Sequence, residues 1–234
     1  MTPDAQKRAA AEAAVALIDA SVHVIGLGSG STAAHFVRAL PAHLAAARLD
    51  GRACVPTSSG TAAIAVEVGL ALVGLDEVGT IDLTVDGADE IGPGLACLKG
   101  AGGALLREKL VWEASRRCVV IGDASKRVAM LGRFPLPVEV EPFGHTTTLR
   151  RIIAGLADCG VAATPRLRLT ADGAPFVTDG GNYIYDASCG AILDPPGVEA
   201  ALKSITGVVE HGLFLGLAER ALISTDEGVV TAER

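Results

Sequence analysis

Short aliphatic runs alternate with helix-like segments along the first half of the chain, and this alternation constrains the fold more than any other feature. Runs such as 22–27, 81–85 and 118–121 have the length of strands and end near glycine, serine or aspartate residues. The segments before and between these runs are predicted as helices, and the first of them carries apolar residues at helical spacing, at Ala14, Leu17 and Ile18. This order predicts an α/β fold with a doubly wound, mostly parallel sheet, in which ligands bind beyond the carboxyl ends of the strands.

The pattern changes near residue 132. The predicted elements then follow the order β-α-β-β-α-β, with a hairpin around the turn at 179–182, and this order is typical of a ferredoxin-like module. We therefore predict two domains. The larger α/β domain is formed by residues 1–131 and 211–234, and the smaller, ferredoxin-like α+β domain by residues 132–210.

Charge and composition limit the partners of the chain. Half of the 234 residues are hydrophobic, and the formal charge is −7 with no run of lysine or arginine to offset it. This balance argues against intrinsic disorder, a nucleic-acid partner and an anionic membrane. An anionic ligand would be held by a few lysines and by backbone N–H groups. The chain opens with helix-start residues rather than a signal peptide, and no apolar run has membrane-spanning length, so we expect a cytoplasmic protein.

The five cysteines form neither a redox pair nor a zinc pattern. They are odd in number, widely spaced and mostly within apolar runs, so we expect buried, reduced thiols. They are Cys54, Cys97, Cys118, Cys159 and Cys189.

The first polar cluster is a glycine-rich turn between a predicted strand and a predicted helix. Its residues Ser29, Gly30, Ser31 and Thr32 offer hydroxyls, backbone N–H groups and a helix N-terminus, which suit a phosphate group. The turn does not match the dinucleotide-binding pattern, whose third glycine would fall at Ser31, and it lacks the P-loop lysine. A tight turn capped by Ser31 or Thr32 is the structural alternative.

The second cluster is the acidic sequence Asp86-Gly87-Ala88-Asp89-Glu90, which follows another predicted strand. Carboxylates this close together raise one another's pKa or attract a cation. A metal site is one alternative, although no histidine lies nearby and the calcium-loop spacing is absent. A solvated acidic turn is the other.

The third cluster begins at Lys99 and continues through Gly100, Ala101 and Gly102 into a helix that carries Glu108. Glycines allow the backbone to approach a ligand closely. Lys126 follows a further strand and could reach the same crevice at the sheet edge. Without this context, Glu108 and Lys126 would be interpreted as ordinary surface residues.

Taken together, these segments resemble ribose-5-phosphate isomerases of type A. The resemblance covers essentially the whole chain, in the order of the family. The matching segments are 28–32, 57–61, 86–90, 99–109, 123–126, 134–140, 181–186 and 207–214. It implies interconversion of D-ribose 5-phosphate and D-ribulose 5-phosphate in the pentose phosphate pathway, with a sugar phosphate as ligand. It also implies a two-domain α/β fold, no metal or cofactor, and a homodimer or homotetramer.

The resemblance assigns a role to each matching position. Glu108 is the proton acceptor, and Asp86, Asp89 and Lys99 are further catalytic residues. The substrate-binding residues are Ser29, Gly30, Ser31, Thr32, Asp86, Gly87, Ala88, Asp89, Lys99, Gly100, Ala101, Gly102 and Lys126. The chain departs from the family at Ser29, where threonine is common, and at Ala101, where glycine is common. Neither change removes a chemical group that the reaction needs.

The isomerisation needs a base that carries a proton between neighbouring carbons. A partly desolvated carboxylate serves this purpose, because desolvation raises its pKa toward neutrality. We expect Glu108 to be that base, with Lys99 and the glycine-turn amides stabilising an enediolate, and we expect catalysis in the larger domain. The leading alternative is a non-catalytic sugar-phosphate sensor, which would be expected to carry a DNA-reading module and a basic face. A CoA-transferase-like or lactone-hydrolysing relative is a third hypothesis, based on fold analogy alone.

Overall fold

Two units make up the structure, a computed structural model that describes residues 1–234. The first unit comprises Met1–Ala88, Arg107–Arg127 and Gly216–Arg234, and the second comprises Asp89–Leu106 and Val128–Leu215. This division differs from the predicted one chiefly at residues 89–106, which the sequence pattern placed in the larger domain.

A seven-stranded sheet forms the centre of the first unit, in the order β14-β13-β7-β4-β1-β2-β3. Neighbouring strands are parallel except β14, which pairs with β13 in antiparallel orientation. The predicted mostly parallel sheet is therefore confirmed. The strands are β1 (Val24–Leu27), β2 (Ala53–Pro56), β3 (Ala71–Leu72), β4 (Leu83–Gly87), β7 (Cys118–Asp123), β13 (Arg220–Thr225) and β14 (Gly228–Glu233).

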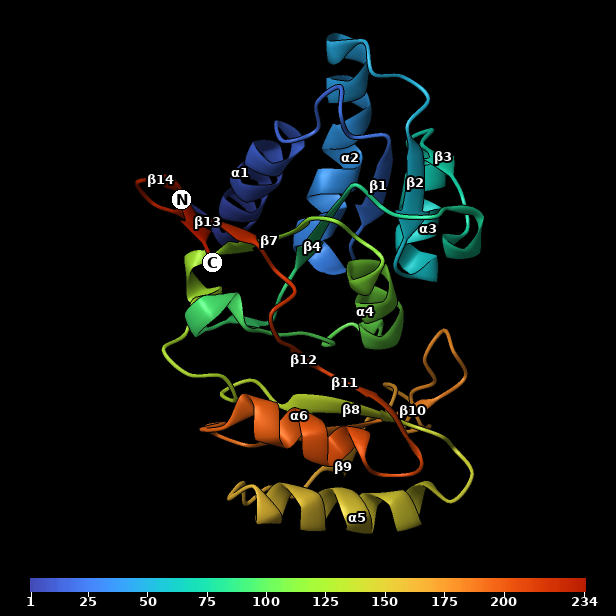
Figure 1. Ribbon diagram of the computed structural model, residues 1–234, viewed down its shortest axis with the longest axis vertical. Coiled ribbons are helices and arrows are strands. Elements are labelled where there is room, and N and C mark those ends of the chain that lie inside the picture. The colour runs from blue at the N-terminus through green and yellow to red at the C-terminus, as the bar shows by residue number, and fades with distance from the viewer. The chain divides into compact units, whose positions relative to one another are not determined.

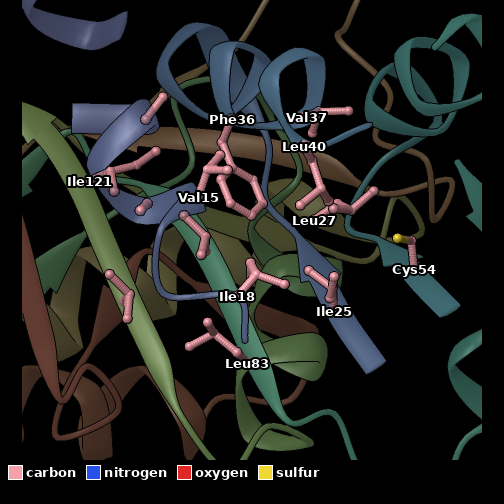
Figure 2. Packing of buried hydrophobic residues seen from close by; sticks show 14 of the residues in the cluster. Val15, Ile18, Ile25, Leu27, Phe36, Val37, Leu40, Cys54, Leu83 and Ile121 are labelled. Atoms are coloured by element: carbon pink, nitrogen blue, oxygen red, sulfur yellow. The ribbon is translucent and has the colours of Figure 1, made fainter. Parts of the chain in front are cut away.

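Helices cover both faces of this sheet. α1 (Pro3–Val15) and α2 (Gly30–Ala47) lie side by side and bury their apolar residues against β1, β4 and β7 (Figure 1). The ring of Phe36 lies at the centre of this core, among Val15, Ile18 and Leu40 (Figure 2). The opposite face contacts α4 (Leu105–Glu113), whose Val111 packs with Val55 and Ile81. α3 (Ser59–Glu67) and the 3-10 turns Leu75–Glu77 and Ala124–Lys126 complete the unit.

α2 differs from its prediction at both ends. The sequence predicts a start near Ala33 and a kink or a restart at Pro41, whereas the helix begins at Gly30 and continues through Pro41 to Ala47. Phe36, Leu40 and Leu44 form one buried face on both sides of the proline. We attribute the continuation to the burial of this face, which outweighs the cost of the missing hydrogen bond.

A four-stranded antiparallel sheet with the order β11-β8-β10-β9 organises the second unit. Helices α5 (His145–Asp158) and α6 (Pro195–Lys203) pack on one side of it (Figure 1). This is the predicted ferredoxin-like arrangement. The predicted strand at 176–178 is absent, and that segment forms a loop. The strands are β8 (Leu136–Val140), β9 (Arg166–Leu167), β10 (Tyr183–Ala187) and β11 (Val208–His211).

A small antiparallel sheet explains why residues 89–106 belong to the second unit. β6 (Cys97–Leu98) pairs with β12 (Leu213–Phe214) on one side and with β5 (Glu90–Ile91) on the other. These strands are two residues long, so side-chain periodicity could not have revealed their pairing. The 3-10 turn Pro93–Leu95 links β5 and β6.

None of the helices combines the length and the apolar character that a membrane span would require.

Phe36→Ala is expected to lower the free energy of unfolding by about 3–5 kcal/mol, because truncation of a fully buried aromatic ring leaves a cavity. Urea denaturation followed by circular dichroism measures the change. Val66→Ala is the control, because Val66 is exposed and its truncation should change stability by less than about 0.5 kcal/mol. Equal effects of the two substitutions would contradict the assigned core.

Candidate active site

The glycine turn after β1 is fastened to the carboxyl end of β4 by Asp86. The Asp86 Oδ1 atom accepts hydrogen bonds from the N–H of Ser29, at 3.0 Å, and from the N–H of Gly87, at 2.7 Å. Gly28 is required here, because a Cβ atom at this position would lie 2.2 Å from Asp86 Oδ1. The buried carboxylate therefore holds the backbone of the predicted phosphate-binding turn.

Asp86 also connects β4 to the helix that carries Glu108. The indole Nε1 of Trp112 donates to Asp86 Oδ2 at 3.1 Å, and the Asp86 side chain is fully buried. The sequence predicts a catalytic and substrate-binding role for Asp86. The structure adds an anchoring role, with donors from the turn, from the end of β4 and from α4.

Glu108 lies in the first turn of α4 and is 5 % exposed. It precedes Trp112 by four residues, so both side chains lie on one face of the helix. Because Trp112 bonds to Asp86, this face is turned toward the carboxyl end of β4. Its burial excludes an arrangement in which the Glu108 side chain lies in open solvent.

The Ser29 hydroxyl belongs to a group of neighbouring hydroxyls. Its Oγ atom shares a hydrogen bond of 2.6 Å with Thr57 Oγ1, donates to Ser58 Oγ at 2.9 Å and lies 3.2 Å from Thr61 Oγ1. Ser58 caps α3 by accepting from the N–H of Thr61. These bonds hold the start of α2 beside the start of α3.

A pocket of about 240 Å³ lies at these two helix N-termini. The first helical N–H groups lack partners within a helix, and the helix dipole adds a partial positive charge there, so the pocket favours an anion. It is lined by Gly30, Ser31, Ala34, Val37, Ser58, Gly60, Thr61 and Ile64.

Two lysines of the first unit lie near the edge of the sheet formed by the carboxyl ends of its parallel strands. Lys7 of α1 donates from Nζ to the Ser31 Oγ atom at 2.9 Å. Lys7 lies outside the three polar clusters of the sequence and was not predicted, although it is the only lysine before Lys99 in an acidic chain. Lys126 is half-buried and lies just beyond β7, which pairs in parallel with β4, so it lies at the sheet edge that also carries Asp86.

The second unit contains the lysine–glycine turn. Lys99 is 2 % exposed, donates its backbone N–H to the Gly212 carbonyl oxygen, and places Nζ 5.5 Å from the centroid of the Phe214 ring. Asp89 Oδ2 accepts from the N–H of Ala101 at 2.9 Å. Asp89 therefore fixes the turn that follows Lys99, as Asp86 fixes the turn of the first unit.

The predicted site residues thus form two groups. The first unit holds the turn at 29–32, the residues from Asp86 to Ala88, Glu108 and Lys126, and the second holds Asp89 and the residues from Lys99 to Gly102. Besides Lys7, sequence reasoning missed Trp112, because an aromatic residue inside a helix is most simply interpreted as core.

The potential metal-ligating side chains and the cysteines are the remaining reactive groups. No group of three or more His, Cys, Asp or Glu side chains is arranged to hold a metal ion. The cysteines form no disulfide. Burial raises the pKa of Cys54 to about 12 and that of Cys189 to about 11, so both thiols stay protonated at neutral pH and are poor nucleophiles.

The bond between Trp112 and Asp86 is expected to stabilise the fold measurably. Trp112→Phe keeps a large ring but removes the donor, and should lower the free energy of unfolding by about 1–3 kcal/mol, as for a buried hydrogen bond to a charged group. A double-mutant cycle with Asp86→Asn, read by urea denaturation, isolates the pair. Additive effects of the two substitutions would show that the bond contributes nothing.

Comparison with protein families gives a match over residues 53–228 to the model of ribose 5-phosphate isomerase A (phosphoriboisomerase A). Among curated proteins, the chain is 59% identical over 230 residues to a ribose-5-phosphate isomerase A of Caulobacter sp. strain K31. The match covers 98% of each protein.

Solved structures give the same result. One neighbour, a D-ribose-5-phosphate isomerase in complex with phospho-erythronic acid, has a TM-score of 0.92 at 36% identity, with both chains covered to 100%. Another, ribose 5-phosphate isomerase A of Methanocaldococcus jannaschii, has a TM-score of 0.90, also at 36% identity and 100% coverage of both chains.

Proposed function

The chain belongs to the ribose 5-phosphate isomerase A family, and from this premise we propose that it interconverts D-ribose 5-phosphate and D-ribulose 5-phosphate with Glu108 as the base. The role of Glu108 as the base is supported by its burial on one face of α4, the face from which Trp112 donates a hydrogen bond to Asp86. A carboxylate withdrawn from water is a stronger base than one on the surface.

The proposed reaction moves one proton between two carbons. Glu108 takes the proton from C2 of the open-chain aldose, and the electron pair of the broken C–H bond forms the C1–C2 double bond of an enediolate. The same residue then returns the proton to C1, while the hydroxyl proton passes from O2 to O1. No atom is gained or lost, so the reaction needs no redox cofactor.

We assign phosphate binding to the start of α2. Gly30, Ser31 and Thr32 supply N–H groups and hydroxyls, and the helix dipole favours the negative charge. Lys7 and Lys126 add positive charge at the same edge of the sheet. Local cations are needed because the chain as a whole carries a charge of −7 and repels a phosphate at long range.

We assign the stabilisation of the enediolate to Lys99 and to the backbone N–H groups from Gly100 to Gly102. Fixed donors of this kind act where charge develops in the transition state. Asp89 is assigned to the sugar hydroxyls and to the holding of this turn. For Asp86 the hydrogen bonds favour anchoring of the phosphate turn over proton transfer, and Gly87 and Ala88 stay predicted contacts.

Phospho-erythronic acid, the ligand of one structural neighbour, is a suitable probe of this chemistry. Its carboxylate places negative oxygen where the enediolate would carry charge. We propose that the chain binds it competitively with the sugar phosphate.

A homodimer or homotetramer and a cytoplasmic location also stay predictions, which sedimentation analysis and cell fractionation can test.

Glu108→Gln is expected to lower kcat by at least about 100-fold, because it removes the base, and to leave KM within about threefold of the wild type. A coupled assay for ribulose 5-phosphate measures both constants. Glu113→Gln is the matched control: it lies on the same helix but is exposed, and it should behave as wild type. Near-full turnover by Glu108→Gln would remove Glu108 from its role.

Lys7→Met is expected to raise KM for ribose 5-phosphate by about tenfold, with kcat little changed, because a distant cation binds substrate and transition state alike. The inhibition constant of inorganic phosphate should rise in parallel. The neighbouring Arg8→Met is the control, because Arg8 pairs with Asp4 at the surface of the same helix. If both substitutions raise KM equally, Lys7 acts only through general charge.

A further inference from the structure

Arg168 binds carbonyl oxygens of the lysine–glycine turn. Its Nη1 atom donates to the carbonyl oxygens of Gly100, at 2.9 Å, and of Ala101, at 3.1 Å. The other edge of the guanidinium binds Asp186, with Nε donating to Oδ2 at 2.8 Å and Nη2 donating to Oδ1. One planar group therefore joins two consecutive peptide carbonyls to a carboxylate.

The orientation of this guanidinium is closely determined. The two-point contact with Asp186 fixes its plane, and its carbon lies 5.8 Å from the centroid of the Phe176 ring. Only 14 % of the side chain is exposed. A lysine would offer a single point charge and could not make this set of contacts.

The turn needs such support because its backbone is unusual. Gly100 has a φ of +111° and Gly103 a φ of +79°, in a region that other residues avoid. A Cβ atom on Gly103 would lie 2.4 Å from the Phe176 ring, the ring over which Arg168 lies. A second side-chain bond to this backbone comes from Asp89, which accepts from the N–H of Ala101.

The two contacted carbonyls belong to the peptide groups that carry the N–H of Ala101 and the N–H of Gly102. A cation at a peptide oxygen draws electron density from the nitrogen and makes the N–H a stronger donor. The Ala101 N–H is directed to Asp89. The Gly102 N–H donates to no other group of the chain and is available for a ligand.

We propose that Arg168, held by Asp186, is a positioning residue for isomerisation: it fixes the turn from Lys99 to Gly102 and strengthens the Gly102 N–H as a donor to the enediolate oxygen. The proposal rests on the role assigned above to this turn. Arg168 acts on the reaction through the backbone.

The test compares two ligands that differ only in the charge at one end. Phospho-erythronate carries a carboxylate that resembles the enediolate, and erythritol 4-phosphate carries a neutral hydroxymethyl group instead. Their inhibition constants do not depend on the fraction of active enzyme, so partial unfolding cannot imitate the expected result.

Arg168→Met is expected to weaken phospho-erythronate about 10- to 100-fold and to lower kcat by a similar factor, as for loss of a donor to an oxyanion. The inhibition constant of erythritol 4-phosphate should change by less than about threefold. Arg168→Lys should fall between Arg168→Met and wild type. Lys203→Met is the control, because it breaks a different ion pair of the same unit, with Glu210, and should leave all these constants unchanged.

Equal weakening of both ligands, or of neither, would overturn the proposal. If circular dichroism shows that neither Arg168 variant folds, Arg168 is a residue of the fold and the proposal is wrong. Glu108→Gln is assayed alongside. Its inactivity together with an unaffected Arg168→Met would reject the role of Arg168 alone, whereas a fully active Glu108→Gln would reject the assigned base.

Discussion

The buried carboxylate of Asp86 is the interaction on which the first unit's site depends. A charge removed from water costs several kcal/mol unless hydrogen bonds compensate it. The compensation comes from the N–H of Ser29, the N–H of Gly87 and the indole of Trp112. Because these donors belong to the turn after β1, to β4 and to α4, satisfying one charge also fixes the predicted phosphate-binding turn relative to the helix of Glu108.

Two glycines, one within β1 and one directly after it, are required by the close approach of β4 side chains. A Cβ atom at Gly26 would lie 1.8 Å from Thr84 Oγ1, and one at Gly28 would lie 2.2 Å from Asp86 Oδ1. Thr84 and Asp86 alternate with Leu83 and Val85, which face the core under α1 and α2. The sheet is thus apolar on that face. On the other face its central strands carry the polar side chains of Thr84 and Asp86, beside which glycine alone can be accommodated.

Much of this architecture could be predicted from the sequence, because it follows from local periodicity. Apolar runs and turn residues predict the parallel sheet and the ferredoxin-like order of elements. The membership of residues 89–106 in the second unit was not, since it depends on two-residue strands that pair with β12 far along the chain. β14 was missed because it is an exposed edge strand with little apolar signal.

The same distinction applies to the site. Ser31, Lys99 and Glu108 could be predicted as site residues because each belongs to a segment with a glycine-rich turn at a strand end, where ligands bind in such folds. Lys7, Trp112 and Arg168 could not. Each was singled out by hydrogen bonds between residues far apart in the sequence, namely Lys7 with Ser31, Trp112 with Asp86, and Arg168 with Gly100 and Ala101, and no local pattern encodes such bonds.

Lys7 and Arg168 also illustrate two uses of positive charge in an acidic protein. Lys7 contacts a hydroxyl and forms no ion pair, so its charge is available to attract a phosphate. The charge of Arg168 is compensated by Asp186, so it adds little to the long-range potential. Its planar guanidinium instead holds two peptide groups in one orientation. An unpaired cation such as Lys7 strengthens the binding of substrate and transition state alike. A paired cation such as Arg168 matters most in the transition state, when negative charge develops beside the backbone that it holds.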